Sequence, residues 1–400
     1  MLNNQLLSLR LRSGMTQEDL SERSGISVRT IRNLERGQVQ RPRRSSVELL
    51  LTVLEPDRRT ELAGPGPGAW RGPRPARTSL VGRDSEVERL ARLVAENQVV
   101  VVAGPGGVGK SRVALAAAQH MGHWFGDGVA VAEMGRIPAE HQGNSQTITD
   151  QTLAVVLKLL TSAPKPPDHG LLLVLDNTEH LPLTTVSLIN RLLGEYPSLH
   201  ILITTRRVPK LHGASVWEIL PLADEPAAKL LLQRLLTTCP TLDLSGDDAR
   251  VTELCRQLDG IPRLLEFAAH RLRMVSLPTL LSHHRATRLL GSSDLAMLPH
   301  QRTLEASMRW SLALLDERQH DLLFRLAGHP GPIHHHDAAR SGASQYDFSE
   351  LDTLELLADL ADASLLQVDR GQEYRYRMLN HVQAFLENCD DRSRYVSAAM

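Results

Sequence analysis

The chain has little cysteine, few aromatic residues and no long apolar run. Its three cysteines form no CxxC pair, so they give no pattern for a zinc site or a disulfide. Aromatic residues make up 4%, too few for a base-stacking platform on single-stranded nucleic acid. No apolar run reaches the roughly 18–20 residues of a membrane helix, and residues 1–14 lack a signal-peptide core. We therefore expect a cytoplasmic protein with no membrane partner.

Lysine is also scarce, and arginine supplies 40 of the 45 Lys and Arg residues. The formal net charge is -1, but residues 1–78 hold 14 arginines against 8 acidic residues, an excess of six. A basic segment on a nearly neutral chain indicates a polyanionic partner for that segment alone.

Continuous apolar runs predict buried parallel strands. They are Val99–Ala103, Leu171–Leu175, His200–Thr204 and, more weakly, Gly128–Ala132. Helical patterns dominate after Asp224. Near the C-terminus, Ser364–Val368 and Glu373–Met378 predict a two-stranded wing around an Arg370-Gly371 turn. The Pro/Gly/Arg-rich residues 63–78 are typical of a flexible tether.

Two short helices joined by a tight turn are predicted near the N-terminus. Thr16 is a helix N-cap, and Ser27 caps a second helix, Val28–Arg36, that ends at Gly37. Ile31 and Leu34 are expected to face inward. This pattern predicts a helix-turn-helix whose second helix enters a DNA major groove. A helical bundle that contacts only proteins is the alternative interpretation.

Residues 6–54 resemble the phage repressor/Cro family. The resemblance depends on Leu9-Arg10, Gly14-Met15-Thr16-Gln17, Leu20, Ser24-Gly25-Ile26-Ser27, Ile31, Leu34-Glu35, Gly37 and Arg41-Pro42-Arg43. It implies that double-stranded DNA is the partner and that Arg10 pairs with Glu35. The residues expected at base edges are Ser27, Val28, Arg29 and Asn33. The residues expected on phosphates are Gln17, Arg36, Gln40 and Arg43. Arginine reads guanine and asparagine reads adenine, whereas phosphate contacts only position the domain.

A phosphate-binding loop of the form G-x-x-x-x-G-K-[ST] runs from Gly104 to Ser111, between a predicted strand and a helix from Ser111 to His120. Glycines let backbone N–H groups converge on phosphate, and the helix N-terminus adds its positive end. Lys110 is expected to reach the β- and γ-phosphates, and Ser111 to hold Mg²⁺. A chance match is disfavoured by the strand and helix on either side.

Two further strands end in polar residues that can bind a metal ion or a phosphate. Asp176 follows Leu171–Leu175 and is the expected second ligand of Mg²⁺. Asn177 stands where many hydrolases keep a second acid, so Glu179 is the nearest candidate base, with a helix-cap role as an equal alternative. Arg206 ends the strand at Thr204-Thr205-Arg206, and an arginine there is placed to stabilise the γ-phosphate.

Residues 79–389 resemble the signal-transducing P-loop ATPases with numerous domains, in particular the NB-ARC-like (AfsR-like) group of bacterial regulators. The carrying motifs are Leu80-Val81-Gly82-Arg83, the phosphate loop, Leu175-Asp176-Asn177-Thr178-Glu179-His180, Thr204-Thr205-Arg206, Leu258-Asp259-Gly260-Ile261-Pro262, Glu266-Phe267-Ala268-Ala269, Thr303-Leu304, Trp310-Ser311 and Tyr376-Arg377-Met378-Leu379. The resemblance implies that the chain binds ATP or ADP with Mg²⁺. It places Val81, Gly82 and Arg83 along one side of the adenine and Pro262 on the other side. The expected contacts of the phosphate loop are Gly104, Gly106, Gly107, Val108, Gly109, Lys110, Ser111 and Arg112.

Departures from that family concern the C-terminal half. Relatives carry a Met-His-Asp motif whose histidine touches the ADP β-phosphate, and this chain has Met378-Leu379-Asn380. His381 or Arg377 is a candidate replacement. Arg263 follows Pro262 where relatives keep an apolar residue, and we interpret it as exposed. His334-His335-His336 with Asp337 is interpreted as a polar loop rather than a metal site, because adjacent side chains point in different directions.

The predicted fold class is multidomain. An all-α helix-turn-helix precedes an α/β P-loop NTPase with a parallel sheet, a helical domain and a winged helix. The expected boundaries are 1–62 for the DNA-binding domain, 63–78 for the linker, 79–223 for the nucleotide-binding domain, 224–295 for the helical domain and 296–400 for the winged helix.

The predicted function is an ATP/ADP-switched transcriptional regulator. ADP is expected to hold a monomer, and ATP a homo-oligomer, with any hydrolysis acting as a slow reset. A protein partner is one source of the activating signal. The alternative is an NB-ARC-like ATP-driven signalling or defence assembly whose residues 1–62 are a protein-interaction adaptor.

Overall fold

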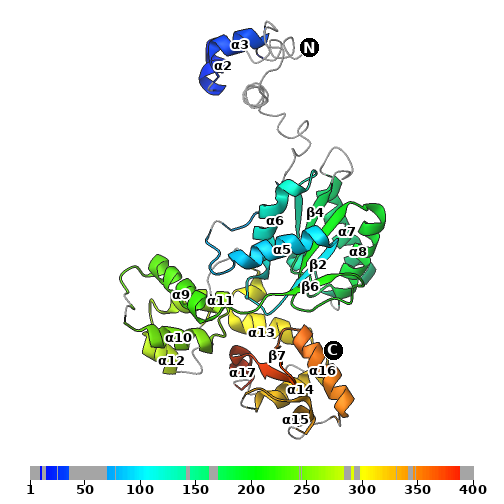
Figure 1. The fold of residues 1–400 in the computed structure, drawn as a ribbon, viewed down its shortest axis with the longest axis vertical. Coiled ribbons are helices and arrows are strands. Elements are labelled where there is room, and N and C mark those ends of the chain that lie inside the picture. Colours follow the sequence, from blue (N-terminus) through cyan, green and yellow to red (C-terminus); the bar gives the residue numbers. More distant parts are fainter. Residues whose placement is uncertain are drawn as a thin grey trace. The chain divides into compact units, whose positions relative to one another are not determined.

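The computed structural model describes residues 10, 15–24, 26–35, 70–76, 78–140, 145–161, 170–242, 244, 246–282, 290–291, 298–329, 331–340, 346 and 348–387. The chain divides into two compact units, Met1–Gly66 and Pro67–Met400 (Figure 1). Among the described residues, no helix is long and apolar enough to cross a membrane.

The first unit contains the predicted helix pair, α2 (Gln17–Ser24) and α3 (Val28–Glu35). Leu20, Ile31 and Leu34 form its buried interior. Thr16 caps α2 by accepting from the Asp19 N–H at 3.0 Å, and the Thr30 N–H approaches the Ser27 hydroxyl at 3.3 Å. These contacts fix both helix starts because they satisfy N–H groups that have no partner within the helix.

An ion pair locks the two ends of this helix pair together, as predicted. Arg10 Nε lies 2.7 Å from Glu35 Oε1, and the Arg10 guanidinium also donates to the Met15 carbonyl at 2.8 Å. Gln17 Nε2 donates to Glu35 as well, at 2.6 Å. The carboxylate of Glu35 is therefore held between two side chains from outside α3.

The second unit is built on a six-stranded, all-parallel sheet in the order β1-β3-β4-β5-β2-β6. The strands are β1 (Trp70–Arg71), β2 (Val99–Ala103), β3 (Val129–Glu133), β4 (Leu171–Asp176), β5 (Leu199–Thr204) and β6 (Ser215–Glu218). All four predicted strands are confirmed. The strand β5 lies between β2 and β4, so the carboxyl ends of these three strands meet at one edge of the sheet.

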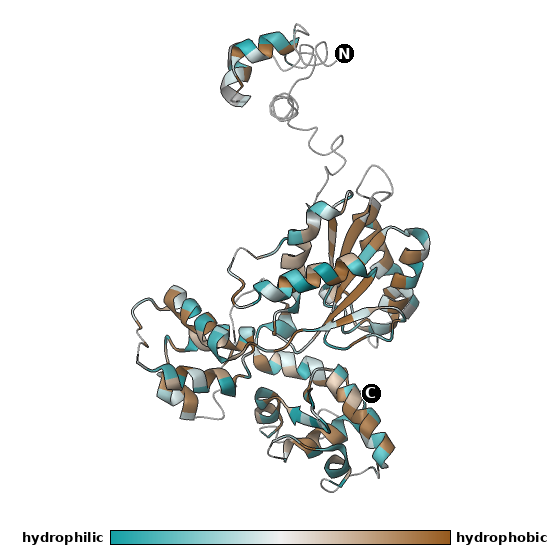
Figure 2. Cartoon of the chain, viewed as in Figure 1, coloured by the Kyte–Doolittle hydropathy of each residue, from teal (hydrophilic) through white to brown (hydrophobic). Residues whose placement is uncertain are grey.

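Helices cover both faces of the sheet (Figure 1). They are α5 (Asp84–Glu96), α6 (Lys110–Met121), α7 (Ser145–Thr161) and α8 (Pro182–Glu195), with short 3-10 turns at Gly122–Trp124 and Met134–Arg136. Alternate β2 residues enter different cores: Val100 packs with α5 and α6, and Val101 packs with α7 and α8. β2 is apolar throughout and β4 is apolar up to Asp176 (Figure 2), because the centre of a parallel sheet covered on both faces has no solvent-facing side.

Two strands lie outside the predicted set. Trp70–Arg71 belongs to the predicted tether, yet it pairs with Val129 and Ala130 of β3, and Arg71 Nη2 donates to the Asp127 carbonyl at 2.8 Å. The prediction of a flexible linker is therefore wrong at these two residues. β6 is short and half-exposed, so its apolar pattern was too weak to predict a strand.

Among the described residues after β6, the named elements are helices and one hairpin. The helices are α9 (Asp224–Thr238), α10 (Asp248–Gln257), α11 (Pro262–Arg271), α12 (Leu277–Ser282), the 3-10 turn Pro299–Gln301, α13 (Leu304–Leu312), α14 (Glu317–Ala327), α15 (His335–Arg340), α16 (Glu350–Asp362) and α17 (Asn380–Glu387). The two strands predicted near the C-terminus are confirmed as the antiparallel pair β7 (Leu366–Arg370) and β8 (Tyr374–Met378).

Candidate functional site

The glycine-rich loop connects β2 directly to α6. Gly104, Gly107 and Gly109 all have positive φ, at 146°, 82° and 106°. A side chain on Gly104 would lie 2.6 Å from the Ile219 carbonyl oxygen, so both the backbone angle and the space require glycine. The loop thus passes tightly from the sheet into the N-terminus of α6, the geometry that presents backbone N–H groups to an anion.

Lys110, the first residue of α6, folds its side chain back across this loop. Its Nζ donates to the carbonyl oxygens of Gly104 at 2.7 Å and Pro105 at 2.9 Å. Burial lowers the pKa of Lys110 to about 7, although the nearby Glu179 works in the opposite direction. A phosphate beside Nζ would restore the charged form, because an opposite charge favours it.

Lys110 is therefore expected to take up a proton when a nucleotide binds above neutral pH. Lys110 is largely neutral in the free protein at pH 8 and charged beside phosphate, so the affinity falls as pH rises above about 7. Calorimetry with ADP in two buffers of different ionisation enthalpy, with EDTA present to keep metal-linked titration of Asp176 out of the measurement, gives the uptake. About one proton per nucleotide is expected at pH 8. A binding enthalpy independent of the buffer contradicts this prediction.

Asp176 lies at the end of β4 beside Ser111, as the predicted magnesium site requires. Its carboxylate accepts hydrogen bonds from the hydroxyls of Thr204 and Ser111 and, at 3.2 Å, from Asn177 Nδ2. Burial raises the pKa of Asp176, and the two hydroxyls oppose that shift. A hydroxyl and a carboxylate are oxygen ligands suited to Mg²⁺, so these residues fit the ion that accompanies a nucleotide.

Arg206 reaches from the end of β5 toward the glycine-rich loop. Its Nε lies 3.1 Å from Glu179 Oε1, and its Nη1 donates to the Ser311 hydroxyl at 2.5 Å and the Ser307 carbonyl at 3.2 Å. A side chain on Gly106 would lie 2.9 Å from the Arg206 Cζ. The guanidinium of Arg206 therefore lies against the phosphate loop and bonds to α13, whose two contacting residues follow Arg206 by 101 and 105 positions.

Glu179 is buried and its second oxygen, Oε2, has no partner among the described residues. Burial by itself would raise the pKa of Glu179, but the charges of Arg206 and Lys110 outweigh it and the pKa is lowered. The carboxylate is thus held ionised at the site, in contact with Arg206. A plain helix-cap role does not account for that contact.

These groups line one cavity of about 200 Å³. Its predicted members are Gly106, Gly107, Gly109, Lys110, Ser111, Arg112, Asp176, Glu179, Arg206 and Pro262. Glu133, Arg263, Glu266 and Gln301 also line it, and the sequence analysis assigned none of them to the site. The interpretation of Arg263 as exposed is wrong, because α11 begins directly against the loop and the Arg263 N–H donates to the Gly107 carbonyl at 3.2 Å.

The predicted adenine-side residues have structural partners outside this cavity. Arg83 is buried and donates to the Leu220 carbonyl at 2.7 Å, and it approaches the Val108 carbonyl at 3.4 Å. Gly82 packs against Pro226, where a side chain would lie 2.5 Å from the proline Cβ. Arg112 donates to the Thr78 carbonyl and hydroxyl, at 3.0 and 2.8 Å. Through Arg83, the Val81-Gly82-Arg83 segment therefore contacts the backbone of the phosphate loop.

Neither candidate replacement for the Met-His-Asp histidine lines the phosphate cavity. His381 is buried, and its Nδ1 lies 2.7 Å from Asp259 Oδ2. The backbone N–H groups of Asn380 and His381 also donate to Asp259, both at 3.0 Å. Arg377 lies 3.9 Å from the same carboxylate. Asp259 thus caps α17 and fastens it to the start of α11.

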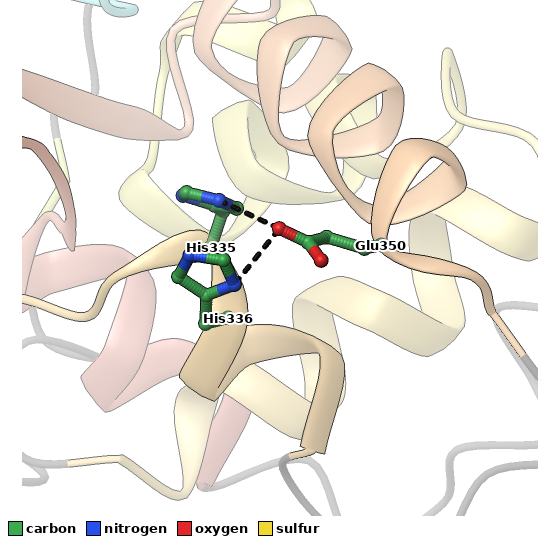
Figure 3. Close-up of side chains that lie close together, drawn as sticks. All are labelled: His335, His336 and Glu350. Carbon is green, nitrogen blue, oxygen red and sulfur yellow. Dashed lines mark hydrogen bonds and ion pairs between the residues drawn. The ribbon is translucent and has the colours of Figure 1, made fainter.

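The histidine run does not form the polar loop that we predicted. His335 and His336 begin α15, and both side chains turn toward Glu350 Oε1, at 3.1 and 2.8 Å (Figure 3). Glu350 is the first residue of α16, so these contacts attach α15 to that helix. The centroids of the two rings lie 3.9 Å apart. The expectation that adjacent histidine side chains point in different directions is therefore wrong for this pair.

The predicted DNA-reading residues lie on the outer side of the helix pair. Ser27 and Arg29 are exposed, whereas Val28 and Asn33 are half-buried. Gln17 bonds to Glu35 and, through Oε1 at 3.3 Å, to Arg32. Arg36, Gln40 and Arg43 lie outside the described residues.

Comparison with known proteins adds relatives for both units. A family described as a helix-turn-helix domain matches residues 4–63. The uncharacterized protein Rv0894 of Mycobacterium tuberculosis is 31% identical over 328 residues, which cover 77% of this chain and 80% of Rv0894. This chain belongs to the same family as Rv0894. It combines a helix-turn-helix domain with a P-loop ATPase fold.

Two further proteins are similar to this chain, one in sequence and one in fold. Rv0890c of the same organism, which carries the name of an HTH-type transcriptional regulator, is 35% identical over 312 residues. That match covers 76% of this chain but only 35% of Rv0890c. The Walker-type ATPase PABY2304 of Pyrococcus abyssi has 14% identity and a TM-score of 0.53, covering 79% of this chain and 98% of its own. At that identity the likeness concerns the fold alone.

Proposed function

We propose that this protein is a transcriptional regulator that binds double-stranded DNA through its N-terminal helix-turn-helix and is switched by ATP and ADP. The helix-turn-helix match and the name of Rv0890c support the DNA-binding part. The phosphate loop and the Walker-type fold support the nucleotide part. A cytoplasmic location follows from a DNA partner in a bacterial cell.

In this proposal, the contact between Arg206 and α13 is what differs between the ATP state and the ADP state. Arg206 lies against Gly106 and at the same time donates to Ser311 and Ser307. A γ-phosphate at the loop attracts this guanidinium and competes with α13 for it. ADP leaves the contact with α13 in place. A ligand moves such an equilibrium only through its different affinity for the two states, and the γ-phosphate supplies that difference.

The cofactor of this switch is a nucleotide with Mg²⁺ held by Ser111 and Asp176. Bound Mg²⁺ neutralises phosphate charge. Because Glu179 is already paired with Arg206, we propose slow hydrolysis that resets the switch rather than rapid turnover. ATP then favours a homo-oligomer, which aligns several DNA-reading helices, and ADP favours a monomer.

We propose the boundaries 1–62 for the DNA-binding part, 224–295 for the helical part and 296–400 for the last part. The nucleotide-binding part comprises residues 79–223 together with β1 (Trp70–Arg71), which pairs with β3 and so does not belong to the connecting segment. The hairpin β7–β8 and its neighbouring helices form the proposed winged helix of the last part.

DNA reading is tested with Arg29→Ala and Asn33→Ala in the full chain. Each lost base contact is expected to weaken sequence-specific binding about 10- to 100-fold, since a good contact contributes roughly 1–3 kcal/mol. Gel shifts with genomic fragments at several salt concentrations measure this. Arg92→Ala is the matched control, because Arg92 is an arginine of α5 with 72% of its side chain exposed. Absence of any shift in every nucleotide state favours the protein-interaction adaptor instead.

A further inference from the structure

Arg263 lies directly on the phosphate loop. It is the second residue of α11, after Pro262, and its N–H donates to the Gly107 carbonyl at 3.2 Å. A side chain on Gly107 would lie 2.9 Å from the Arg263 Cβ and 3.5 Å from its Cδ. The stem of Arg263 therefore covers the loop, and Arg263 is one of the residues that line the 200 Å³ cavity.

The guanidinium of Arg263 has no hydrogen-bond or ion-pair partner among the residues that the structure describes. The carboxylates of Glu266, Glu179 and Asp176 lie near enough to favour its charged form, but none of them bonds to it, and two of them bond to other arginines. Glu266 pairs with Arg234 at 3.0 Å and with Arg112 at 3.5 Å. Glu179 pairs with Arg206 at 3.1 Å.

Arg263 is half-buried, so its charge is only partly hydrated in the free protein. Burial lowers the pKa of Arg263 to about 10, and the positive charge of Arg206 acts in the same direction. Taking a charge out of water without a partner is unfavourable, whereas a phosphate restores the lost hydrogen bonds and neutralises the charge. The planar guanidinium also matches two phosphate oxygens at once.

We propose that Arg263 contacts the terminal phosphate of a bound nucleoside triphosphate and makes the affinity depend on that phosphate. This inference rests on the proposed nucleotide function and deepens it. Arg263 shares its end of the cavity with Arg206, Asp176 and Glu179, the groups placed around Mg²⁺ and the γ-phosphate. Because Arg263 belongs to α11, the contact transmits the presence of the γ-phosphate to the helical part of the chain.

The test compares Arg263→Leu, Arg263→Lys and the wild type as full chains, with Mg²⁺ and either ATPγS or ADP as the probe. Arg263→Leu is expected to weaken ATPγS about tenfold or more, since hydrogen bonds to charged groups contribute roughly 1.5–3 kcal/mol. The ADP affinity changes by less than about threefold, because ADP lacks the contacted phosphate. Arg263→Lys keeps the charge but cannot bond two phosphate oxygens in the same plane, so its affinity for ATPγS is expected to lie between those of the wild type and Arg263→Leu. Arg250→Leu, at an exposed arginine of α10, is the control.

Thermal unfolding without nucleotide separates this role from a structural one. The leucine variant is expected to unfold at the same temperature as the wild type or higher, because a half-buried charge without a bonded partner has been removed. A lower unfolding temperature, or equal losses of ATPγS and ADP affinity, overturns the inference. Wild-type affinity for ATPγS in Arg263→Leu overturns the inference alone, and a wild-type protein that binds neither nucleotide overturns the proposed function as well.

Discussion

Replacing Lys110 with alanine is expected to weaken ATP and ADP binding by about a hundredfold or more, because it removes the cation that the phosphate loop directs at the phosphates. Lys110 Nζ is held within the loop by the Gly104 and Pro105 carbonyls, and no other lysine lines the cavity. Equilibrium titration of the full chain with a fluorescent ATP analogue measures the loss. Promoter output should change with it.

The control for this substitution is Lys158→Ala, an exposed lysine in α7 where alanine keeps the helix. The Lys110→Ala protein is expected to retain DNA binding in gel shifts, because the helix-turn-helix belongs to the other compact unit. An unaltered ATP affinity in Lys110→Ala would refute the assignment of Gly104–Ser111 as the nucleotide loop.

Asp259→Ala is expected to release α17 from the rest of the second unit. The carboxylate of Asp259 is buried and accepts two backbone N–H groups and the His381 imidazole, at 3.0, 3.0 and 2.7 Å. Removing it leaves these donors unpaired, at a cost of about 3–5 kcal/mol. Amide hydrogen exchange over Asn380–Glu387 should accelerate by about two to three orders of magnitude, since each 1.4 kcal/mol is a factor of ten.

Asp259 also has a positive φ of 52°, which alanine adopts with strain. Asp259→Asn tolerates that conformation and keeps an acceptor oxygen, so its effect on exchange should be smaller than that of alanine. Asp369→Ala, at an exposed position of β7, is the control for a lost carboxylate. Unchanged exchange in α17 of the alanine variant would show that Asp259 does not hold this helix.

Local patterns along the chain were sufficient for the elements at the centre of the site. β2 is apolar throughout and is followed by a loop whose glycines are required by positive φ, so both the strand and the loop could be predicted. The N-caps Thr16 and Ser27 marked α2 and α3 for the same reason: the chemistry of a helix start acts between neighbouring residues. β1 and α17 depend on distant partners and were not predicted.

By itself, the sequence determined the helix pair, the phosphate loop, the strand that ends in Asp176 and the family resemblance, because each depends on residues close together in the chain. Only the tertiary structure decided which distant residues meet at the loop. Arg206 reaches α13, Arg263 lies on Gly107, and Asp259 caps α17 across 121 residues of chain. These contacts join residues about 100 or more positions apart, and nothing in the local pattern of a lone arginine or aspartate specifies such a partner.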